Sequence, residues 1–274
     1  ISSDGRWVVY ARNNSNADSD LFLIDTTADQ LDLVNITPHN GDIEYSAMGF
    51  TPDSSQLIYS TNESGEFSQA WTLFLETGER KVLVADDWDV MYVDYSPSGR
   101  YRISGVNNDA STNVTLTDLA TGEDLVLKNV PDGDLAQVRF NRDETAIAFG
   151  LNRDTAPYDL YHMPLGGQAV QLTQALNPAI NSNLMVEGEV VRFASYDGLQ
   201  IPGIIYKPRE ASAKNPAPAM VWVHGGPGGQ SRKGYSATIQ HLVNHGYAVF
   251  QINNRGSSGY GKTFYHLDDL KHGD

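Results

Sequence analysis

A glycine-rich loop is the part of this sequence with the clearest potential for chemistry. The segment His224-Gly225-Gly226-Pro227-Gly228-Gly229-Gln230 follows the apolar run 219–223, which is typical of a buried strand. Glycine lets the backbone approach a ligand closely and adopt φ values that other residues avoid. Such a loop can present backbone N–H groups to a developing oxyanion, and losing one such donor slows acyl transfer about 100- to 1000-fold.

The elements around this loop indicate the beginning of an α/β sheet. Residues 189–196 and 199–206 predict a hairpin, because Asp197-Gly198 between them is a strong two-residue turn signal. An amphipathic helix is predicted over 235–245 and a buried strand over 247–252. A second glycine-rich loop, 253–261, comes next. A His-Gly-Gly loop leaving a strand supplies half of the oxyanion hole in α/β-hydrolases, yet the chain contains no Gly-x-Ser-x-Gly nucleophile elbow.

The first part of the chain repeats. Residues 50–59, 95–104 and 140–149 align at a spacing of 45 residues, and residues 2–11 form a fourth copy. Each copy makes a turn rich in Pro, Asp, Ser and Gly and then enters a strand. Second strands follow, at 21–24, 71–74, 114–117 and 160–163. Short strands at this period are typical of four-stranded β-propeller blades.

Charge changes along the chain as the repeat stops. The formal net charge is −15, but residues 1–185 carry 27 acidic and 10 basic residues, whereas residues 186–274 carry 7 and 9. We therefore predict two domains, 1–185 and 186–274. The acidic part is a poor nucleic-acid binder, because phosphate contacts need Lys and Arg. No apolar run is long enough for a transmembrane helix, so we expect no membrane partner.

Neither the ends of the chain nor its composition indicates the cellular compartment. The chain begins at Ile1 inside a repeat copy, so we interpret it as a window cut from a longer protein, and localisation stays unknown. It contains no cysteine, which excludes disulfides and thiolate metal sites. His241 and His245 are four residues apart on the predicted helix, but Leu242 stands where a zincin motif has Glu, and no third ligand is evident. We predict no metal and no organic cofactor.

The two glycine loops and the repeats together resemble the prolyl oligopeptidase family, in particular its acylaminoacyl-peptidase and bacterial dipeptidyl-peptidase-like branch. The match covers the whole chain. It rests on the loop at 224–230, on Asn253-Asn-Arg-Gly-Ser-Ser-Gly-Tyr-Gly261, on TolB-type blades and on the ending 268–274. The resemblance implies incomplete propeller blades followed by the N-terminal part of an α/β-hydrolase domain. It also implies a serine peptidase that cleaves short peptides, with the propeller as a filter of substrate size.

The resemblance also implies roles for individual residues. Gly226 would donate its backbone N–H to the oxyanion, while His224 and Gly225 orient the loop. Arg255 and Tyr260 match the family's loop near the active-site entrance and are candidates for substrate binding. The catalytic Ser, Asp and His of the family lie C-terminal to both glycine loops, so this chain contains none of the three and is expected to be inactive alone.

Other interpretations of these residues are weaker. His224 as the general base is disfavoured, because α/β-hydrolases place the base last in the chain. Ser257 and Ser258 lack the spacing of a nucleophile elbow. The glycine spacing at 256–261 does not fit a dinucleotide fingerprint, and the loop at 225–229 lacks the Lys-Ser/Thr of a phosphate loop. Large aromatic residues of the repeats are expected to pack in cores rather than to line a channel: Trp71, Trp88 and Tyr92.

Two other functions stay open at this point. The protein could be an esterase that carries a propeller, or a propeller interaction module with a vestigial hydrolase segment. The sequence also leaves open the P1 preference, the number of blades and the oligomeric state. Finally, the apolar run 219–223 would form an open sheet edge in a chain of this extent, which predicts poor solubility.

Overall fold

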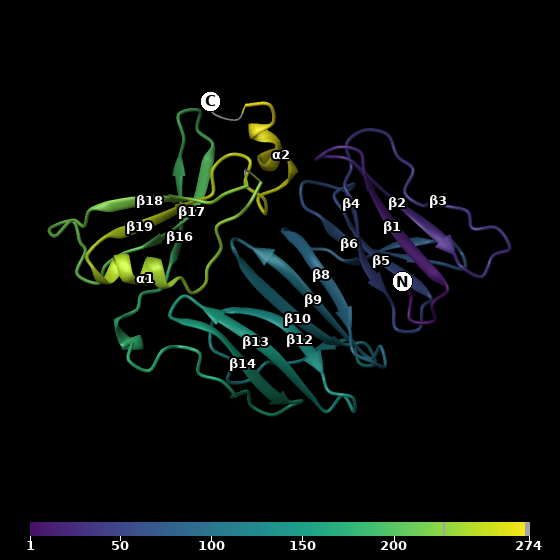
Figure 1. Ribbon diagram of the computed structural model, residues 1–274, viewed down its shortest axis with the longest axis horizontal. Helices are drawn as coiled ribbons and strands as arrows, with labels where there is room; N and C mark the ends of the chain where they lie inside the picture. The colour runs from purple at the N-terminus through teal and green to yellow at the C-terminus, as the bar shows by residue number, and fades with distance from the viewer. Residues whose placement is uncertain (227, 272–274) are drawn as a thin grey trace. The chain divides into compact units, whose positions relative to one another are not determined.

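The computed structural model of the protein describes residues 1–226 and 228–271, and its first part is a series of antiparallel sheets (Figure 1). In each sheet the strands are neighbours in the order in which they occur along the chain. These sheets confirm the predicted blades, and every predicted second strand lies within β2, β6, β10 or β14. The strands are β1 (Trp7–Asn13), β2 (Ser19–Asp25), β3 (Val34–Asn35); β4 (Tyr45–Phe50), β5 (Gln56–Thr61), β6 (Gln69–Phe74), β7 (Arg80–Val84); β8 (Asp89–Tyr95), β9 (Tyr101–Asn108), β10 (Ser111–Asp118), β11 (Glu123–Asp124); β12 (Asp134–Phe140), β13 (Ala146–Arg153), β14 (Ala156–Pro164) and β15 (Val170–Gln171).

The repeated turn has the same backbone conformation in every copy. Its first residue accepts a hydrogen bond from the N–H three residues later and donates its own N–H to the carbonyl five residues later, as in the pair of bonds that Thr51 makes with Ser54 and Gln56. The residue in the fourth position is left-handed each time, with φ between 52° and 79°. This shared turn explains why the sequence signal survives although the side chains differ: Gly5, Ser54, Gly99 and Glu144.

Apolar side chains from successive sheets form the cores of this part. One cluster joins Leu21 of β2 to Leu57 and Tyr59 of β5, and Trp71 packs against it. A second cluster joins Ile58 of β5 to Val90 of β8, with Trp88 beside it. Both tryptophans therefore pack against cores, as predicted.

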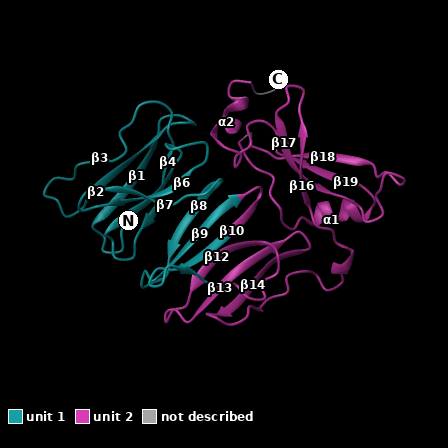
Figure 2. Ribbon diagram, turned by 180° about the vertical axis from the view of Figure 1, so that it is seen from behind, with its two compact units in different colours: residues 1–107, 114–126 teal, residues 108–113, 127–274 magenta. Residues whose placement is uncertain are grey.

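By its contacts the chain divides into two compact units (Figure 2). Unit 1 comprises residues 1–107 and 114–126, and unit 2 comprises residues 108–113 and 127–274. The last sheet, β12 to β15, and the turn between β9 and β10 thus belong to the same unit as the C-terminal region. The sequence-based boundary near residue 185 stays a prediction.

The C-terminal region forms a mixed sheet in the order β16-β17-β19-β18. Its elements are η1 (Ser182–Leu184), β16 (Glu189–Ala194), β17 (Gln200–Tyr206), β18 (Ala219–Val223), α1 (Ala237–Asn244), β19 (Ala248–Ile252), α2 (Lys262–Tyr265) and η2 (His266–Asp268). The predicted hairpin is confirmed, but its turn is wider than two residues. Ser195 N–H bonds to the Leu199 carbonyl and Gly198 is left-handed at φ 87°, which is a three-residue loop with a glycine bulge.

Helix α1 connects the parallel strands β18 and β19. Its N-cap is Ser236, whose hydroxyl accepts the Ile239 N–H at 3.3 Å, and Gly246 follows its end at φ 89°. Ile239 and Val243 pack on Ile204 of β17 in the core of this region. The predicted helix over 235–245 is thus confirmed, with ends trimmed by one or two residues.

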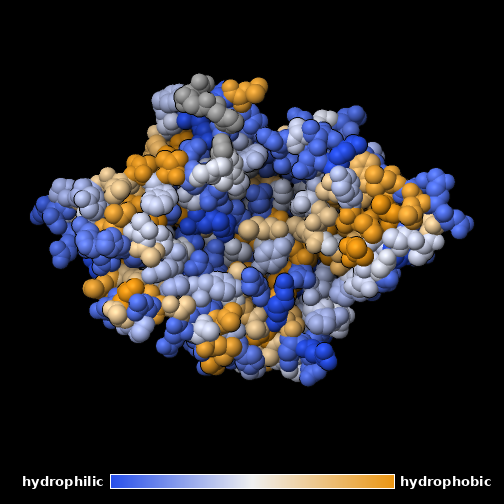
Figure 3. Space-filling model, in the orientation of Figure 1, coloured by the Kyte–Doolittle hydropathy of each residue, from blue (hydrophilic) through white to orange (hydrophobic). Residues whose placement is uncertain are grey.

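Strand β18 has the apolar pattern of a buried strand but forms the open sheet edge that we expect for a chain of this extent. It lies at the edge of the described sheet, and all five of its residues are exposed, with Val221 at 65%. Apolar surface is visible in this region in Figure 3. The apolar pattern is that of a strand covered on both faces, but the described residues cover neither face fully. Separately, none of the described helices has the length and hydropathy needed to cross a membrane.

Candidate active site

Two glycine-rich loops, the first over 224–236 and the second over 253–261, begin at the same edge of the sheet. They follow β18 and β19, which are parallel neighbours with Val223 opposite Ile252. The carboxyl ends of adjacent parallel strands therefore release both loops side by side, where open α/β sheets bind ligands. The loops contact each other directly, since the Ser258 N–H donates to the Gly229 carbonyl at 3.0 Å.

Gly226 has the backbone geometry expected of a donor to a ligand. Its φ is 58°, so glycine is favoured by conformation, although a Cβ would meet no atom within 4 Å. Its carbonyl accepts the Gly229 N–H at 2.6 Å, which closes a tight turn. Its own N–H has no acceptor among the residues that the structure describes. An exposed, unpaired backbone donor is what an oxyanion site requires.

Two other glycines of the first loop, Gly228 and Gly229, are needed for close packing. A Cβ on Gly229 would lie 2.7 Å from the Gly225 carbonyl oxygen, and one on Gly228 would lie 2.5 Å from the Tyr265 ring. A Cβ on Gly225 would meet nothing within 4 Å. Pro227 lies outside the described residues. The loop is therefore compact because of positions 228 and 229, and it leaves the backbone of 225 and 226 accessible.

His224 links the first loop to the second. Its Nε2 lies 2.8 Å from the Ser257 hydroxyl, which in turn donates to the Asn254 carbonyl at 2.7 Å. Because a hydroxyl has one proton, Nε2 carries the proton of the bond to Ser257. In the neutral ring Nδ1 then has no proton to donate, so its 3.3 Å contact with the Gly225 carbonyl is a contact rather than a hydrogen bond.

The Ser257–His224 pair has the spacing of a nucleophile and a base, but not the surroundings. Ser257 is fully buried, and its hydroxyl proton is directed to Asn254. A substrate carbonyl has no access to such an oxygen. The pair therefore joins the two loops, and this agrees with the sequence argument against Ser257 and His224 as nucleophile and base.

Asn253 is a buried hub that the sequence analysis missed. Its Oδ1 accepts the Ser231 N–H at 2.6 Å, and its Nδ2 donates to the Ser231 carbonyl at 3.0 Å and to the Tyr260 hydroxyl at 2.8 Å. Its own N–H donates to the Pro202 carbonyl at 2.9 Å. One fully buried amide thus connects both loops and β17. The only available signal was an Asn placed directly after a buried strand.

Tyr260 is placed by this hub. Its hydroxyl accepts from Asn253, and its half-buried ring packs edge-on against Phe264, with centroids 5.6 Å apart. Burial raises the pKa of Tyr260, so the phenol stays protonated at neutral pH. These contacts hold the second loop. The role of Tyr260 in substrate binding stays a prediction.

Arg255 reaches across to the β16–β17 turn. Its Nη2 bonds to Asp197 at 2.6 Å, its Nη1 donates to the Ser195 hydroxyl at 3.1 Å, and its guanidinium lies over the Tyr196 ring, 5.0 Å from the centroid. The Leu199 N–H and Arg255 lower the pKa of the Asp197 carboxyl, which is therefore charged at neutral pH.

One cleft, of about 830 Å³, brings several of these residues together. His224, Gly226 and Arg255 line it, along with the β16–β17 turn and η2. Gly225 and Tyr260 do not line this cleft. Within the described part of the chain no group of three potential metal ligands is present. The arrangement is a backbone donor beside a pocket that is lined by two cations, Arg255 and Lys271, of which Arg255 is paired to the Asp197 carboxylate.

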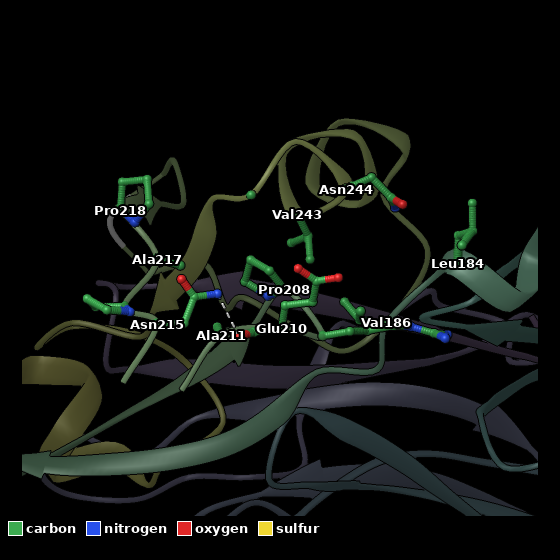
Figure 4. A pocket seen from close by; sticks show the side chains of 13 residues that line it. Leu184, Val186, Pro208, Glu210, Ala211, Asn215, Ala217, Pro218, Val243 and Asn244 are labelled. Carbon is green, nitrogen blue, oxygen red and sulfur yellow. Dashed lines mark hydrogen bonds between the residues drawn. The ribbon is translucent and has the colours of Figure 1, made fainter. Parts of the chain in front are cut away.

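A second cavity, of about 500 Å³, lies between the loop at 208–218 and the C-terminal end of α1 (Figure 4). Proline and aliphatic side chains form much of its wall, and the Asn215 side chain is held by the Glu210 carbonyl at 3.0 Å. None of the candidate site residues lines it. The cleft that His224, Gly226 and Arg255 line is therefore the candidate site.

Comparison with known proteins finds sequence similarity to peptidases. Residues 233–274 match the model of the prolyl oligopeptidase family. The chain is 32% identical over 122 residues to the uncharacterized peptidase YuxL of Bacillus subtilis, covering 44% of this chain and 19% of that protein. It is 25% identical over 224 residues to dipeptidyl aminopeptidase BIII of Pseudoxanthomonas mexicana, covering 79% of this chain and 32% of that protein.

Solved structures show the same fold. A prolyl endopeptidase superposes with a TM-score of 0.81 at 17% identity, over 98% of this chain and 39% of that one. A puromycin-hydrolyzing peptidase of Mycobacterium tuberculosis gives 0.79 at 15% identity, over 97% and 42%. The chain thus spans about a fifth to two fifths of the proteins described here. The chain therefore shares the fold of these solved structures, and over residues 233–274 its sequence is similar to the prolyl oligopeptidase family.

Proposed function

We propose that this chain supplies the oxyanion-binding side of a serine peptidase active site. The observation that carries the proposal is that Gly226 lines the cleft and that its backbone N–H has no acceptor among the described residues. In acyl transfer, a serine attacks the peptide carbonyl and the oxygen becomes negative. A fixed backbone donor stabilises that oxygen more than it stabilises the starting carbonyl.

The other predicted site residues have roles that fit this proposal. His224 holds the first loop against Ser257, so the donor keeps its direction during the reaction. Arg255 holds the β16–β17 turn at the wall of the cleft, where it would shape the space for a substrate. A donor cannot replace the nucleophile and base that form the acyl-enzyme, so residues 1–274 alone would be inactive.

Short peptides are the proposed substrates. The family relationship supports a peptidase, and one structural neighbour, a puromycin hydrolase, is complexed with PGG. In this proposal the blades limit the size of the substrates that reach the cleft.

The test uses the product of the complete reading frame beside residues 1–274. We expect the former to hydrolyse short peptide p-nitroanilides, to show a burst of product and to react with a fluorophosphonate, and we expect the latter to do none of the three. A substrate series of increasing length, ending with a denatured protein, tests the size limit. Hydrolysis of p-nitrophenyl esters without cleavage of any peptide would identify an esterase instead. No hydrolysis and a specific partner retained by residues 1–185 would identify a binding module.

A further inference from the structure

A run of four residues at the end of the first glycine loop is tied to turns of the blades. Arg232 Nη2 donates to the Thr112 hydroxyl at 2.7 Å and contacts Asp134 Oδ2 at 3.2 Å. The next three residues use backbone N–H groups: Lys233 donates to the Ala110 carbonyl at 3.0 Å, Gly234 to Asp154 Oδ1 at 2.8 Å and Tyr235 to Asn152 Oδ1 at 3.3 Å. All these residues belong to unit 2.

Asp154 makes the largest number of these connections. It lies in the turn between β13 and β14, and its side chain is 3% exposed. Oδ1 accepts from the Tyr206 hydroxyl at 2.8 Å as well as from Gly234, and Oδ2 accepts from the Gly188 N–H at 2.9 Å. Lys233 Nζ lies 3.5 Å from Oδ2 and provides a nearby positive charge. A buried carboxylate needs such donors, and bonds to a charged acceptor are about twice as strong as neutral ones.

The backbone of the β13–β14 turn is also hydrogen-bonded to α1. The Asp154 carbonyl accepts from Gln240 Nε2 at 2.9 Å, and Gln240 is also bonded to both backbone groups of Val186, at 2.7 and 3.0 Å. Burial and the Asp154 carboxylate raise the pKa of Tyr206, so this phenol remains a donor. One turn therefore contacts the segment before β16, the end of β17, the first glycine loop and α1.

Packing at a second turn supports the same connection. Ala110 is fully buried and belongs to the apolar cluster of Ile204, Ile239 and Val249. Its φ is 70°, a left-handed conformation that is unfavourable for alanine. Glycine would avoid that cost, but only a side chain fills the space in the cluster. The methyl group thus keeps the β9–β10 turn inserted beside Lys233.

We infer that Asp154, assisted by Ala110, is a positioning residue for the first glycine loop: the blade turns fix the C-terminal half of the loop whose N-terminal half carries Gly226. This inference rests on the proposed function of Gly226. It adds that the blades do more than limit access, because they also hold the oxyanion donor in place through residues 232–235.

Asp159 provides a matched control. Asp159 is likewise buried, with 3% of the whole residue exposed against 5% for Asp154, and it lies in the same sheet. Its hydrogen-bond partners among the described residues are within the sheet and the segment that follows it: Gln171, Thr173 and Ala175. Asp159→Asn therefore removes a buried charge from the same blade without touching the glycine loop. A general loss of blade stability affects both variants, whereas loss of positioning affects only Asp154→Asn.

The first experiment is amide hydrogen exchange on residues 1–274. In Asp154→Asn we expect amides of 186–188 and 232–235 to exchange at least about tenfold faster while β13 and β14 stay protected. In Asp159→Asn we expect faster exchange near 171–175 and no change at 232–235. Ala110→Gly is the second variant, for use if Asp154→Asn does not fold. It removes the methyl group and relieves the left-handed conformation, and we expect it also to speed amide exchange at 232–235. Unchanged exchange at 232–235 in the folded variants, or equal acceleration across the blade, overturns the inference.

The second experiment uses the product of the complete reading frame. We expect kcat per fluorophosphonate-titrated site to fall about ten- to hundredfold in Asp154→Asn with little change in KM, because misplacement of about 1 Å can have such an effect. A purely structural role would reduce the number of titratable sites and leave kcat per site unchanged. If the wild type cleaves no peptide, the proposed function fails, but the exchange experiment still decides whether Asp154 positions the loop.

Discussion

His224 Nε2 and the Ser257 hydroxyl lie 2.8 Å apart and join two loops that begin on neighbouring parallel strands. The bond turns a potential base and a potential nucleophile into a structural connection. Gly226, two residues after His224, lines the cleft, and its N–H has no acceptor among the described residues.

We predict that His224→Ala loosens both glycine loops. The substitution removes the donor to Ser257, and a lost hydrogen bond of this kind costs about 1 kcal/mol of stability. Amides of 257 and 258 should exchange faster, and thermal unfolding should begin at a lower temperature. His224→Gln, which retains a donor, should restore part of the protection. Equal exchange in the wild type and His224→Ala would show that the bond contributes nothing.

Glycine positions 225 and 229 should respond differently to the same substitution. Gly229→Ala places a Cβ 2.7 Å from the Gly225 carbonyl oxygen and should destabilise the chain by about 1–3 kcal/mol. Gly225→Ala places its Cβ in open space and should change the free energy of unfolding by less than about 0.5 kcal/mol. Urea unfolding of both variants measures the difference. Similar values for the two would contradict the described loop conformation.

The stability of unit 1 should depend on pH through His39. Its Nδ1 lies 2.8 Å from the Thr37 carbonyl and its Nε2 lies 3.0 Å from Asp18, so the folded state favours the doubly protonated ring. The Thr37 carbonyl, with Asp18 and Asp20, raises the pKa of His39 against the opposing effect of burial. The stabilisation is therefore complete below the unfolded pKa of about 6.5 and is lost as pH rises through the higher folded value.

The measurement is calorimetric unfolding between pH 5 and pH 9, compared with His39→Gln. The difference in melting temperature between wild type and variant should shrink as pH rises through this range. A difference that grows with pH would have the wrong sign for a raised pKa.

The sequence predicted the blades because each copy repeats one turn conformation. Ser54, Gly99 and Glu144 occupy the same left-handed position although their side chains share nothing. The surrounding pattern of aromatic, Pro, Asp and β-branched residues sufficed to place the strands. The wider turn at Asp197-Gly198 was missed, because the same dipeptide fits both a two-residue turn and a three-residue loop with a bulge.

The site was predicted in part. The loop motifs and their order are local and could be read directly, and three of the five candidate residues line one cleft. Asn253 and Asp154 were missed because their importance lies in partners far along the chain, such as Gly234 at 80 residues from Asp154. The apolar pattern of β18 is typical of a buried strand, whereas its exposure in this chain follows from its place at the sheet edge, as the sequence analysis expects.

Exposure of β18 predicts self-association of residues 1–274. Val221 is 65% exposed on an edge strand, and such an edge is a template for pairing with another chain. We expect concentration-dependent association by analytical ultracentrifugation, which Val221→Lys should reduce. Leu33→Lys, at a loop residue that is 52% exposed, is the control and should have little effect. A monodisperse wild type at high concentration would contradict the prediction.

The pairing of Val223 with Ile252 has a consequence for sequence change in this region. Side chains alternate between the two faces of a strand, so deleting one residue from β18 would turn every later side chain to the opposite face. His224 would then point away from Ser257 although both residues were still present. The spacing between the strand and its histidine is thus as much a requirement of the site as the histidine itself.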